Sequence, residues 1–592
     1  MAKMTTAKST APSDTKRPAR LARNISPAQI ELHGVHAAYP GARTEAIAGI
    51  DLEIPAGQYV CVLGGNGSGK STLLQLMNTL VPPSAGRVRV FGLETAGEGN
   101  PIAIRSRCAS VFQHPEDQMV TSIVADDVAF GPENLRVPQP EIARRVDAAL
   151  EATGMGEFAQ SDPADLSGGQ MQRVAIAGAL AMEPEILLLD EPCAMLDARG
   201  RADVRAIIGR LSARGITIVH VTHFMEDALD ADRAIVLERG RIAFDGMPEQ
   251  AFSDEGRVRA LGLEAPCEPR RILDAMKARS AVPPASSPAV PPASSPASSR
   301  AVPPASSPAS SRAAVDPDLA FLGEPSVVFD GVSFSYATAR NPRKRRGGVL
   351  GGGKRTEDAP PMAPLAVSDL SFRAFPGTLT ALVGRTGSGK STTAELACAL
   401  KLPLSGTVRI CGVDTADLNR RSDIRRHVGY VSQLPERQLF AETVFEDVAF
   451  GPRNLGLSDD EVSTRVRDAL ASVNLDPTDE LLTRSPFSLS GGQQRGVALA
   501  GVLAMRQDVL VLDEPMAGLD PAGRRHVRAI LHDLKRAGST LIMVTHSMED
   551  VAELAEQVIA LDRGRTVASG TPEQVLPALL DAGEVGVHGS SR

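Results

Sequence analysis

The sequence predicts an α/β protein made of two copies of one domain, each built on a largely parallel core sheet. Short apolar runs rich in β-branched residues alternate with segments of helix length in both halves of the chain, a pattern typical of parallel sheets with helices between the strands. The same strings recur in the same order in both halves, which indicates an internal repeat. We expect core strands at residues 59–63, 186–189, 216–221, 379–383, 509–512 and 540–544.

The repeat is clearest in two glycine-rich strings. GGNGSGKST at residues 64–72 recurs as GRTGSGKST at residues 384–392, and LSGGQ at residues 166–170 recurs at residues 489–493. The spacing is kept as well, because the lysine of the first string precedes a glutamine by 43 residues in both halves. Two domains of one architecture therefore account for most of the chain.

Composition divides the chain into folded and unfolded stretches. A tract of Pro, Ala and Ser between the copies cannot bury apolar surface and is typical of an extended, solvated tether. The basic N-terminal segment superficially resembles a transit peptide, but we favour a disordered tail. We predict an N-terminal tail at 1–27, a first domain with a C-terminal extension at 28–279, a linker at 280–323, a second domain at 324–580 and a C-terminal tail at 581–592.

The second domain carries an irregular insertion at about residues 339–361. Its basic run at 343–346 would suit anionic lipid or nucleic acid, but such runs are common in solvated loops, which we favour. The string GVLGGGKR at 348–355 imitates a phosphate-binding loop, yet it has arginine where a hydroxyl is needed and follows no strand. We therefore exclude it as a nucleotide site.

Overall composition excludes several classes of protein. A net charge of -8 and a pI near 5.8 argue against a surface built to hold nucleic acid. The six cysteines form no Cys-x-x-Cys pair, which favours idle thiols in a reducing compartment. No apolar run reaches the roughly 18 residues needed to span a bilayer. We expect a cytoplasmic protein that is at most peripheral to a membrane.

The first recurring string has the chemistry of a phosphate-binding loop. Its glycines let backbone N–H groups surround the phosphates, its lysine reaches the β- and γ-phosphates, and its serine hydroxyl binds Mg²⁺. Each string follows an apolar strand and opens a helix, so the phosphates lie at a helix N-terminus. The predicted loop residues are Gly64, Asn66, Gly67, Ser68, Gly69, Lys70, Ser71 and Thr72, and Gly384, Thr386, Gly387, Ser388, Gly389, Lys390, Ser391 and Thr392.

Each half also contains an apolar strand that ends in Asp-Glu. Asp190 and Asp513 are placed to support Mg²⁺, and the adjacent Glu191 and Glu514 to activate water, as in phosphoryl-transfer sites. Taken alone, an Asp-Glu pair is more typical of a solvated helix start than of a catalytic site. Here the pair belongs to an ordered series of motifs, which favours the catalytic interpretation.

With LSGGQ added, the series resembles the ATP-binding cassette family, the nucleotide-binding domains of ABC transporters, over almost all of both halves. The resemblance implies two tandem P-loop NTPase domains, each with a RecA-like parallel-sheet core, an antiparallel β subdomain and a helical signature subdomain. It also implies head-to-tail pairing, with ATP and Mg²⁺ between the phosphate loop of one copy and the signature of the other. Both sites are expected to hydrolyse ATP.

The resemblance assigns residues to each shared site. Site one would use Lys70, Ser71, Gln113, Asp190, Glu191 and His223, closed by Ser490, Gly491, Gly492 and Gln493 of the other copy. Site two would use Lys390, Ser391, Gln433, Asp513, Glu514 and His546, closed by Ser167, Gly168, Gly169 and Gln170. The expected catalytic groups are Glu191, His223, Glu514 and His546. The expected Mg²⁺ ligands are Ser71, Gln113, Asp190, Ser391, Gln433 and Asp513.

Three kinds of residue in these sites receive more particular roles from the resemblance. The glutamines match the Q-loop, which senses Mg²⁺ and the attacking water. The histidines follow the glutamates by 32 residues in both copies and match the switch histidine, which contacts the γ-phosphate. Tyr39 and Tyr336 match the aromatic that stacks on adenine, with core packing as the alternative. Asp197 and Asp520 match the D-loop.

Two longer strings indicate one branch of this family. DDVAFGPENL at 126–135 and EDVAFGPRNL at 446–455 are similar to the energy-coupling factor branch of ABC importers. That branch implies a transmembrane coupling subunit and a substrate-capturing membrane subunit for a vitamin or a transition-metal ion, at the cytoplasmic face of the membrane and without nucleic acid. Two alternatives stay open: the ATPase of another ABC transporter, such as a sugar importer or an export pump, and a soluble tandem-cassette ATPase in translation or DNA repair.

Acidic residues lie just past each Q-loop glutamine. They are Glu116 and Asp117 in the first copy and Glu436 in the second. From this place in the family pattern, we expect them to face basic residues of the coupling subunit.

Overall fold

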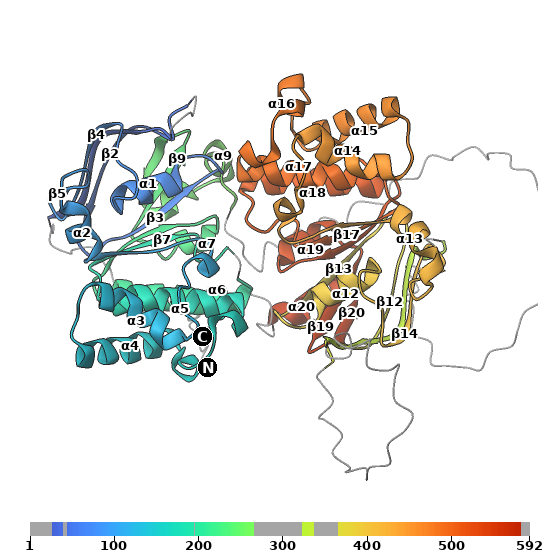
Figure 1. The fold of residues 1–592 in the computed structure, drawn as a ribbon, viewed down its shortest axis with the longest axis horizontal. Helices are drawn as coiled ribbons and strands as arrows, with labels where there is room; N and C mark the ends of the chain where they lie inside the picture. The colour runs from blue at the N-terminus through green and yellow to red at the C-terminus, as the bar shows by residue number, and fades with distance from the viewer. Residues whose placement is uncertain (1–26, 40–43, 195, 266–322, 337–364, 582–592) are drawn as a thin grey trace, which may run out of the picture.

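The computed structural model describes residues 27–39, 44–194, 196–265, 323–336 and 365–581. Nearly all of the predicted tails and of the linker lie outside these residues, as do the insertion, its basic run and its GVLGGGKR string. Within them the chain forms two copies of an α/β domain, each with a small antiparallel sheet, a larger core sheet and a group of helices (Figure 1). The predicted fold class is confirmed.

A four-stranded antiparallel sheet opens each copy. Its first strand buries alternate residues, and a bulge after Leu32 shifts the alternation so that Val35 also faces the core, as a one-sided sheet requires. The strand order is β2-β1-β4-β5 in one copy and β12-β11-β14-β15 in the other. The strands are β1 (Ala28–Ala37), β2 (Ile47–Pro55), β4 (Ala85–Val90), β5 (Leu93–Glu94), β11 (Val327–Phe334), β12 (Val367–Ala374), β14 (Ser405–Ile410) and β15 (Val413–Asp414).

The core sheet of each copy has six strands, in the orders β10-β9-β3-β8-β7-β6 and β16-β17-β18-β13-β19-β20. All neighbours pair in parallel except the last hairpin of each copy. Parallel strands are covered on both faces, which explains the continuous apolar runs. The strands are β3 (Tyr59–Gly64), β6 (Cys108–Val111), β7 (Ile186–Asp190), β8 (Thr217–Val221), β9 (Arg233–Glu238), β10 (Arg241–Gly246), β13 (Leu379–Gly384), β16 (Val428–Val431), β17 (Val509–Asp513), β18 (Thr540–Val544), β19 (Gln557–Asp562) and β20 (Arg565–Gly570).

Helices cover the core sheets and form a separate packed group in each copy. The helices of the first copy are α1 (Lys70–Met77), α2 (Asn100–Arg105), α3 (Val124–Asn134), α4 (Gln139–Thr153), α5 (Gly168–Ala181), α6 (Ala198–Ala213), α7 (Met225–Ala228), α8 (Pro248–Ala251) and α9 (Glu255–Ala260). Those of the second are α12 (Lys390–Ala397), α13 (Arg421–His427), α14 (Val444–Asn454), α15 (Asp459–Ser472), α16 (Asp479–Thr483), α17 (Gly491–Leu503), α18 (Pro521–Arg536), α19 (Met548–Leu554) and α20 (Pro572–Asp581). None of the helices in the described ranges is long and apolar enough to cross a bilayer.

Several apolar clusters hold each copy together, and two kinds of cluster recur in both copies beside those on the other face of the core sheet. One cluster joins the antiparallel sheet, the helix after the phosphate loop and one face of the core sheet. A second cluster lies within the group of α3, α4 and α5, or of α14, α15 and α17. The helical group therefore has its own core and meets the sheet through α5 or α17.

The two copies lie side by side and inverted, as Figure 1 shows. In that view the helical group of the first copy, α3 to α5, is at the lower end, whereas the group of α14 to α17 in the second copy is at the upper end. Polar contacts between the copies join the loops at the carboxyl ends of the core strands. This is where parallel α/β sheets place their ligand sites.

Candidate nucleotide sites shared between the two copies

Each phosphate loop has a backbone that only glycine can adopt. Gly64 and Gly384 have φ of 143° and 145°, and a Cβ atom would lie 2.3 Å and 2.1 Å from main-chain oxygens of β9 and β19. Gly69 and Gly389, with φ of 102° and 101°, end the loops at the N-caps of α1 and α12. The loops therefore present main-chain N–H groups at a helix start, which is a cradle for anions.

The lysine of each loop is buried and held inside it. The Lys70 ammonium donates to the carbonyl oxygens of Gly64 and Gly65, both at 2.9 Å. Lys390 makes the equivalent bonds at 2.8 Å. Burial lowers the pKa of both lysines, and the nearby carboxylates oppose that effect.

Mg²⁺ fits the residues at the ends of β7 and β17. Burial raises the pKa of the Asp190 and Asp513 carboxyls, and the hydroxyl of the serine that follows each loop lysine, Ser71 or Ser391, opposes that effect. The Asp190 Oδ1 atom is buried and accepts no hydrogen bond from the residues that the structure describes. A buried carboxylate oxygen next to a hydroxyl is a donor set suited to Mg²⁺.

Glu191 and Glu514 follow these aspartates with a strained backbone. Their φ angles are 49° and 50°, in the left-handed region that non-glycine residues seldom occupy. Their N–H groups donate to Val221 and Val544 of the neighbouring strands at 2.9 Å and 3.0 Å. The sheet thus holds each glutamate in a conformation that costs on the order of 1–3 kcal/mol, as functional sites often do.

The predicted histidine and glutamine of each copy meet at its glutamate. His223 Nε2 lies 2.6 Å from Glu191 Oε1, and the amide of Gln113 donates to the other oxygen at 3.3 Å. In the second copy His546 Nε2 lies 3.0 Å from Glu514 Oε1, and Gln433 donates at 3.4 Å. The same three side chains therefore converge in both copies.

Charges from both copies set the ionisation of Glu514. Burial alone raises its pKa, but the hydrogen bond and charge of His546, followed by the charges of Lys390 and Arg201, outweigh burial and leave the pKa below its ordinary value. Arg201 belongs to the first copy, on α6. Glu514 is therefore ionised at neutral pH and can accept a proton from water.

Each LSGGQ string forms the capped start of a long helix. Ser167 is the N-cap of α5 and Ser490 that of α17, each in a capping box with the glutamine three residues on. A Cβ atom on Gly168, Gly491 or Gly492 would meet nothing within 4 Å among the described residues. These helix starts are open, so an anion can approach their N–H groups closely.

The D-loop aspartates connect the two copies. Asp197 Oδ1 accepts from Gly200 N at 2.8 Å and caps α6, while its Oδ2 accepts from Thr386 N in the other phosphate loop at 3.2 Å. The hydrogen bonds that it accepts outweigh the effect of burial and lower its pKa. One carboxylate therefore serves its own helix and the phosphate loop of the other copy.

The second D-loop repeats this arrangement toward the first copy. Asp520 Oδ1 accepts from Gly523 N at 2.8 Å and caps α18, and its Oδ2 accepts from Asn66 N at 2.8 Å. The sequence motifs had matched both aspartates to the D-loop without giving them a bonding partner. Their contacts hold each phosphate loop against the copy that carries the opposite signature.

Further contacts between the copies involve arginines. Arg524 on α18 donates to the main-chain oxygen of His223 at 3.2 Å and pairs with Glu264 of the first copy at 3.2 Å. Arg437 lies 3.5 Å from Glu116, so the segments after the two Q-loop glutamines also touch. These contacts are not evident from either copy's motifs.

The two candidate adenine residues lie at the edge of each phosphate loop. The Tyr39 hydroxyl lies 3.1 Å from Thr72 Oγ1, and the Tyr336 hydroxyl lies 2.9 Å from Thr392 Oγ1. The rings are 44% and 49% exposed, so packing in the core does not explain them. In the second copy the Lys401 ammonium lies 4.2 Å from the ring centroid of Tyr336. One ring face thus holds a cation–π contact.

Sequence reasoning found the residues of each single copy but not the hydrogen bonds and ion pairs that join the copies. The phosphate-loop, Asp-Glu, glutamine and histidine groups come together within each half. The geometry thus defines a protein with two mononucleotide-type phosphate sites, each completed by a loop from the opposite copy.

Comparison with known proteins identifies the family. A family model described as "ABC transporter" matches residues 47–194 and 367–517. A protein of Bifidobacterium longum named "Putative ABC transporter ATP-binding protein" is 37% identical over 557 residues, 91% of this chain and 66% of that protein. A relative of the same description from Methanosarcina mazei is 32% identical over 94% of this chain and 91% of its own length. The "Energy-coupling factor transporter ATP-binding protein EcfA1" of Symbiobacterium thermophilum is 52% identical over 222 residues, 37% of this chain and 77% of that protein.

The chain belongs to the ABC transporter family. Its two copies are ABC ATPase cassettes, which hydrolyse ATP. The resemblance read from the motifs is confirmed at this level. The chain spans just under two thirds of the length of the Bifidobacterium relative, 66% of it.

Proposed function

We propose that this chain is the energising subunit of an energy-coupling factor importer, with two composite ATP sites in one polypeptide. The observation that carries the proposal is the 52% identity of a 222-residue segment, 37% of the chain, to an EcfA1 protein, together with the DDVAFGPENL and EDVAFGPRNL strings after the Q-loops. The cargo is a vitamin or a transition-metal ion, which membrane subunits select. The chain acts at the cytoplasmic face of the membrane.

In the proposed mechanism each phosphate loop binds the triphosphate of ATP, and the opposite LSGGQ helix start closes on the γ-phosphate. Lys70 and Lys390 turn from the loop carbonyls toward the β- and γ-phosphates. Ser71, Asp190 and Gln113 in the first copy, and Ser391, Asp513 and Gln433 in the second, would hold Mg²⁺, which when bound would supply positive charge to the phosphate oxygens. Tyr39 and Tyr336 stack on the adenine rings.

Glu191 and Glu514 then orient and deprotonate the attacking water. His223 and His546, held against these glutamates, reach toward the γ-phosphate and stabilise its charge in the transition state. The proton passes from water to the glutamate carboxylate, and the products are ADP and phosphate. Because ATP favours the closed pairing of the copies and ADP does not, each cycle drives closure and reopening.

An exposed apolar surface beside both Q-loops is our proposed docking surface for the coupling subunit. Soluble proteins seldom leave grouped aromatic side chains in water unless they bind a partner. Phe440 and Phe450 contact each other edge to face, with centroids 4.9 Å apart. The group comprises Phe112, Val120 and Phe130 in the first copy and Phe440 and Phe450 in the second, all at least 40% exposed.

The expectation for the acidic residues near the Q-loops needs revision. Glu116 already pairs with Arg437 of the other copy, and Glu436 lies 3.8 Å from Arg495 on α17. Both carboxylates therefore have partners within the chain. We propose that the apolar surface, rather than these charges, provides most of the docking energy.

Purification of the tagged chain from detergent-solubilised membranes tests the proposal. We expect a multi-span coupling protein and a small membrane protein to copurify, and the variant with Phe130→Ser and Phe450→Ser to lose both while keeping its own ATPase rate. A control variant with Ile102→Ser and Leu418→Ser removes two exposed apolar residues away from the Q-loops and should keep both partners. Copurification of ribosomes, or of no membrane protein at all, would contradict the importer assignment.

A further inference from the structure

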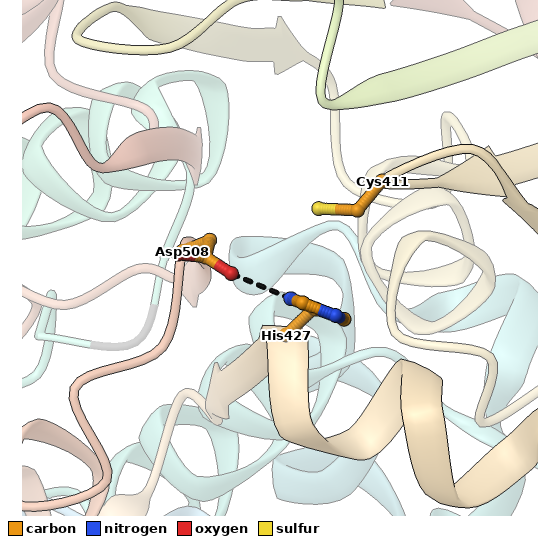
Figure 2. Close-up of side chains that lie close together, drawn as sticks. All are labelled: Cys411, His427 and Asp508. Atoms are coloured by element: carbon orange, nitrogen blue, oxygen red, sulfur yellow. Dashed lines mark hydrogen bonds and ion pairs between the residues drawn. The ribbon is translucent and has the colours of Figure 1, made fainter. Parts of the chain in front are cut away.

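A cluster of potential metal ligands lies in the second copy, away from both nucleotide sites. Cys411, His427 and Asp508 each bring one ligand atom to a place where these atoms all lie within 4.8 Å of one another. Figure 2 shows the three side chains converging from separate segments, with the His427 ring below the thiol and to the lower right of the carboxylate in this view. His427 Nδ1 is 2.5 Å from Asp508 Oδ2. The cluster has no part in the proposed ATPase mechanism.

The fold fixes all three residues through their main chains. Cys411 is the first residue of the two-residue turn between β14 and β15, with φ of 47°, and its N–H donates to Ser326 O at 2.7 Å. His427 ends α13 directly before β16, and Asp508 directly precedes β17. Because these strands pair in parallel from their first residues, the register sets His427 and Asp508 side by side.

A neighbouring glutamine connects the segments that carry His427 and Asp508. The Gln507 amide donates to the main-chain oxygens of Arg425 and Val428, both at 2.7 Å. It therefore ties the residue before Asp508 to the segment that carries His427. Contacts of this kind, made by residues next to the ligands, hold the ligand side chains in position without binding the metal themselves.

The first copy provides an internal comparison at the same three structural positions. Phe91 occupies the equivalent turn, Arg107 ends the segment before β6, and Glu185 precedes β7. The Arg107 guanidinium lies 3.8 Å from the Phe91 ring centroid and pairs with Glu185 at 2.6 Å. In the first copy, a cation–π contact and an ion pair therefore connect these three positions.

In the second copy all three of those side chains are replaced by metal-ligand types. A His–Asp pair alone would be a shorter version of the Arg–Glu ion pair. The cysteine is not explained in that way, because its small side chain cannot form a cation–π contact with the neighbouring cation. Sulfur, imidazole and carboxylate together instead make a ligand set that Zn²⁺ accepts.

We propose that Cys411, His427 and Asp508 form a binding site for Zn²⁺ or a similar borderline-soft dication. Three protein ligands leave a fourth position for water. The thiol releases its proton to solvent when the metal binds. Cys411 and Asp508 are exposed, which leaves an entry path for the ion.

Only small movements would be needed to seat the ion. Zn–S and Zn–N bonds of about 2.3 Å and 2.0 Å separate tetrahedral ligand atoms by about 3.5 Å, which is more than the 2.5 Å between His427 and Asp508 and less than the 4.8 Å within which all the ligand atoms lie. The His–Asp hydrogen bond would open as the thiol side chain rotates inward. Mg²⁺ prefers oxygen ligands in an octahedral arrangement, so it should not compete.

The proposed site would tie the antiparallel subdomain to the core sheet. Its ligands lie on the β14–β15 turn and at the amino ends of β16 and β17, whereas Asp513 and the phosphate loop follow carboxyl ends of core strands. We therefore expect metal to raise the thermal stability of the second copy. ATP turnover should stay unchanged, because the nucleotide sites lie at the opposite edge of the sheet.

Metal binding to the chelator-treated, reduced full chain tests the proposal. Zn²⁺ is added without nucleotide and with excess Mg²⁺, and bound zinc is counted by equilibrium dialysis and mass spectrometry. The matched control carries C411F, H427R and D508E, the arrangement with which the first copy folds. We expect the wild-type chain to bind one more Zn²⁺ than this control, which corrects for binding elsewhere.

Placing the three ligand residues in the first copy provides a second test. Adding F91C, R107H and E185D to the control should restore the binding of one Zn²⁺ per chain, now in the first copy. Co²⁺ bound to the wild type should also give a thiolate charge-transfer absorption that is absent in C411S. Equal zinc binding by wild type and control, or cobalt spectra unaffected by C411S, would overturn the proposal. If the triple exchange fails to fold, C411S alone decides, with at least about tenfold weaker Zn²⁺ binding expected.

Discussion

The contact of Asp520 with the phosphate loop of the other copy can be removed almost in isolation. Its Oδ1 caps α18 and its Oδ2 accepts from Asn66 N. Asp520→Asn keeps one oxygen for the cap, at which asparagine is as good as aspartate. The other atom becomes an amide nitrogen, which cannot accept from the loop N–H. The substitution therefore removes the bond between the copies and leaves the helix intact.

The size of the effect follows from the type of bond. A hydrogen bond to a charged group contributes about 1.5–3 kcal/mol, and we take the lower end because this contact is exposed. A change of about 1.4 kcal/mol is tenfold in an equilibrium. Because closure must precede hydrolysis, we expect kcat/KM for ATP to fall about tenfold in Asp520→Asn.

Steady-state ATP hydrolysis by the purified chain measures this effect. Asp533→Asn serves as the control, since it makes the same chemical change on the exposed face of α18 and should leave kcat/KM unchanged. The thermal unfolding of both variants should match that of the wild type. A kcat/KM for Asp520→Asn within twofold of the wild type would refute a role for this contact in closure.

Further variants at four positions probe separate parts of the structure. Tyr336→Ala should weaken ATP binding at site two about tenfold by calorimetry, through loss of stacking worth about 1–3 kcal/mol, whereas Tyr336→Phe should not; equal losses in both would exclude stacking. Arg528→Met leaves the buried Asp550 carboxylate without the guanidinium 2.6 Å away and should lower unfolding free energy by about 3–5 kcal/mol, as denaturant titration can measure. Gly384→Ala should abolish ATP binding at its loop, because the new Cβ would lie 2.1 Å from a main-chain oxygen. Gly501→Ala, which meets nothing within 4 Å in α17, should stabilise the helix by up to about 1 kcal/mol in thermal melts.

The sequence predicted the fold class and the grouping of site residues within each copy because their determinants are local. A phosphate loop needs glycines and a lysine in consecutive positions, and parallel strands buried on both faces appear as continuous apolar runs. Gln113, Glu191 and His223 belong to three separate strings, yet each string follows a core strand. Their meeting at one edge of the sheet therefore follows from the parallel arrangement.

Contacts between the copies could not be predicted in the same way. Thr386 meets Asp197, and Arg437 meets Glu116, only because two folded surfaces dock in an inverted arrangement. No spacing rule within one copy encodes such a pair. The same limit applies to Cys411, which the absence of a Cys-x-x-Cys pair had suggested was idle. Its neighbours lie 16 and 97 residues further along the chain and are brought together by strand register.

The most direct measurement of the central claim is nucleotide trapping by the chain with Glu191→Gln and Glu514→Gln. Each single change should slow ATP turnover, because one site loses its base. The double variant should retain two ATP per chain after rapid gel filtration and elute with the mass of a single chain, since both composite sites are formed within one polypeptide. Wild-type turnover by the double variant, or trapping of ATP only in a dimer of chains, would contradict the account.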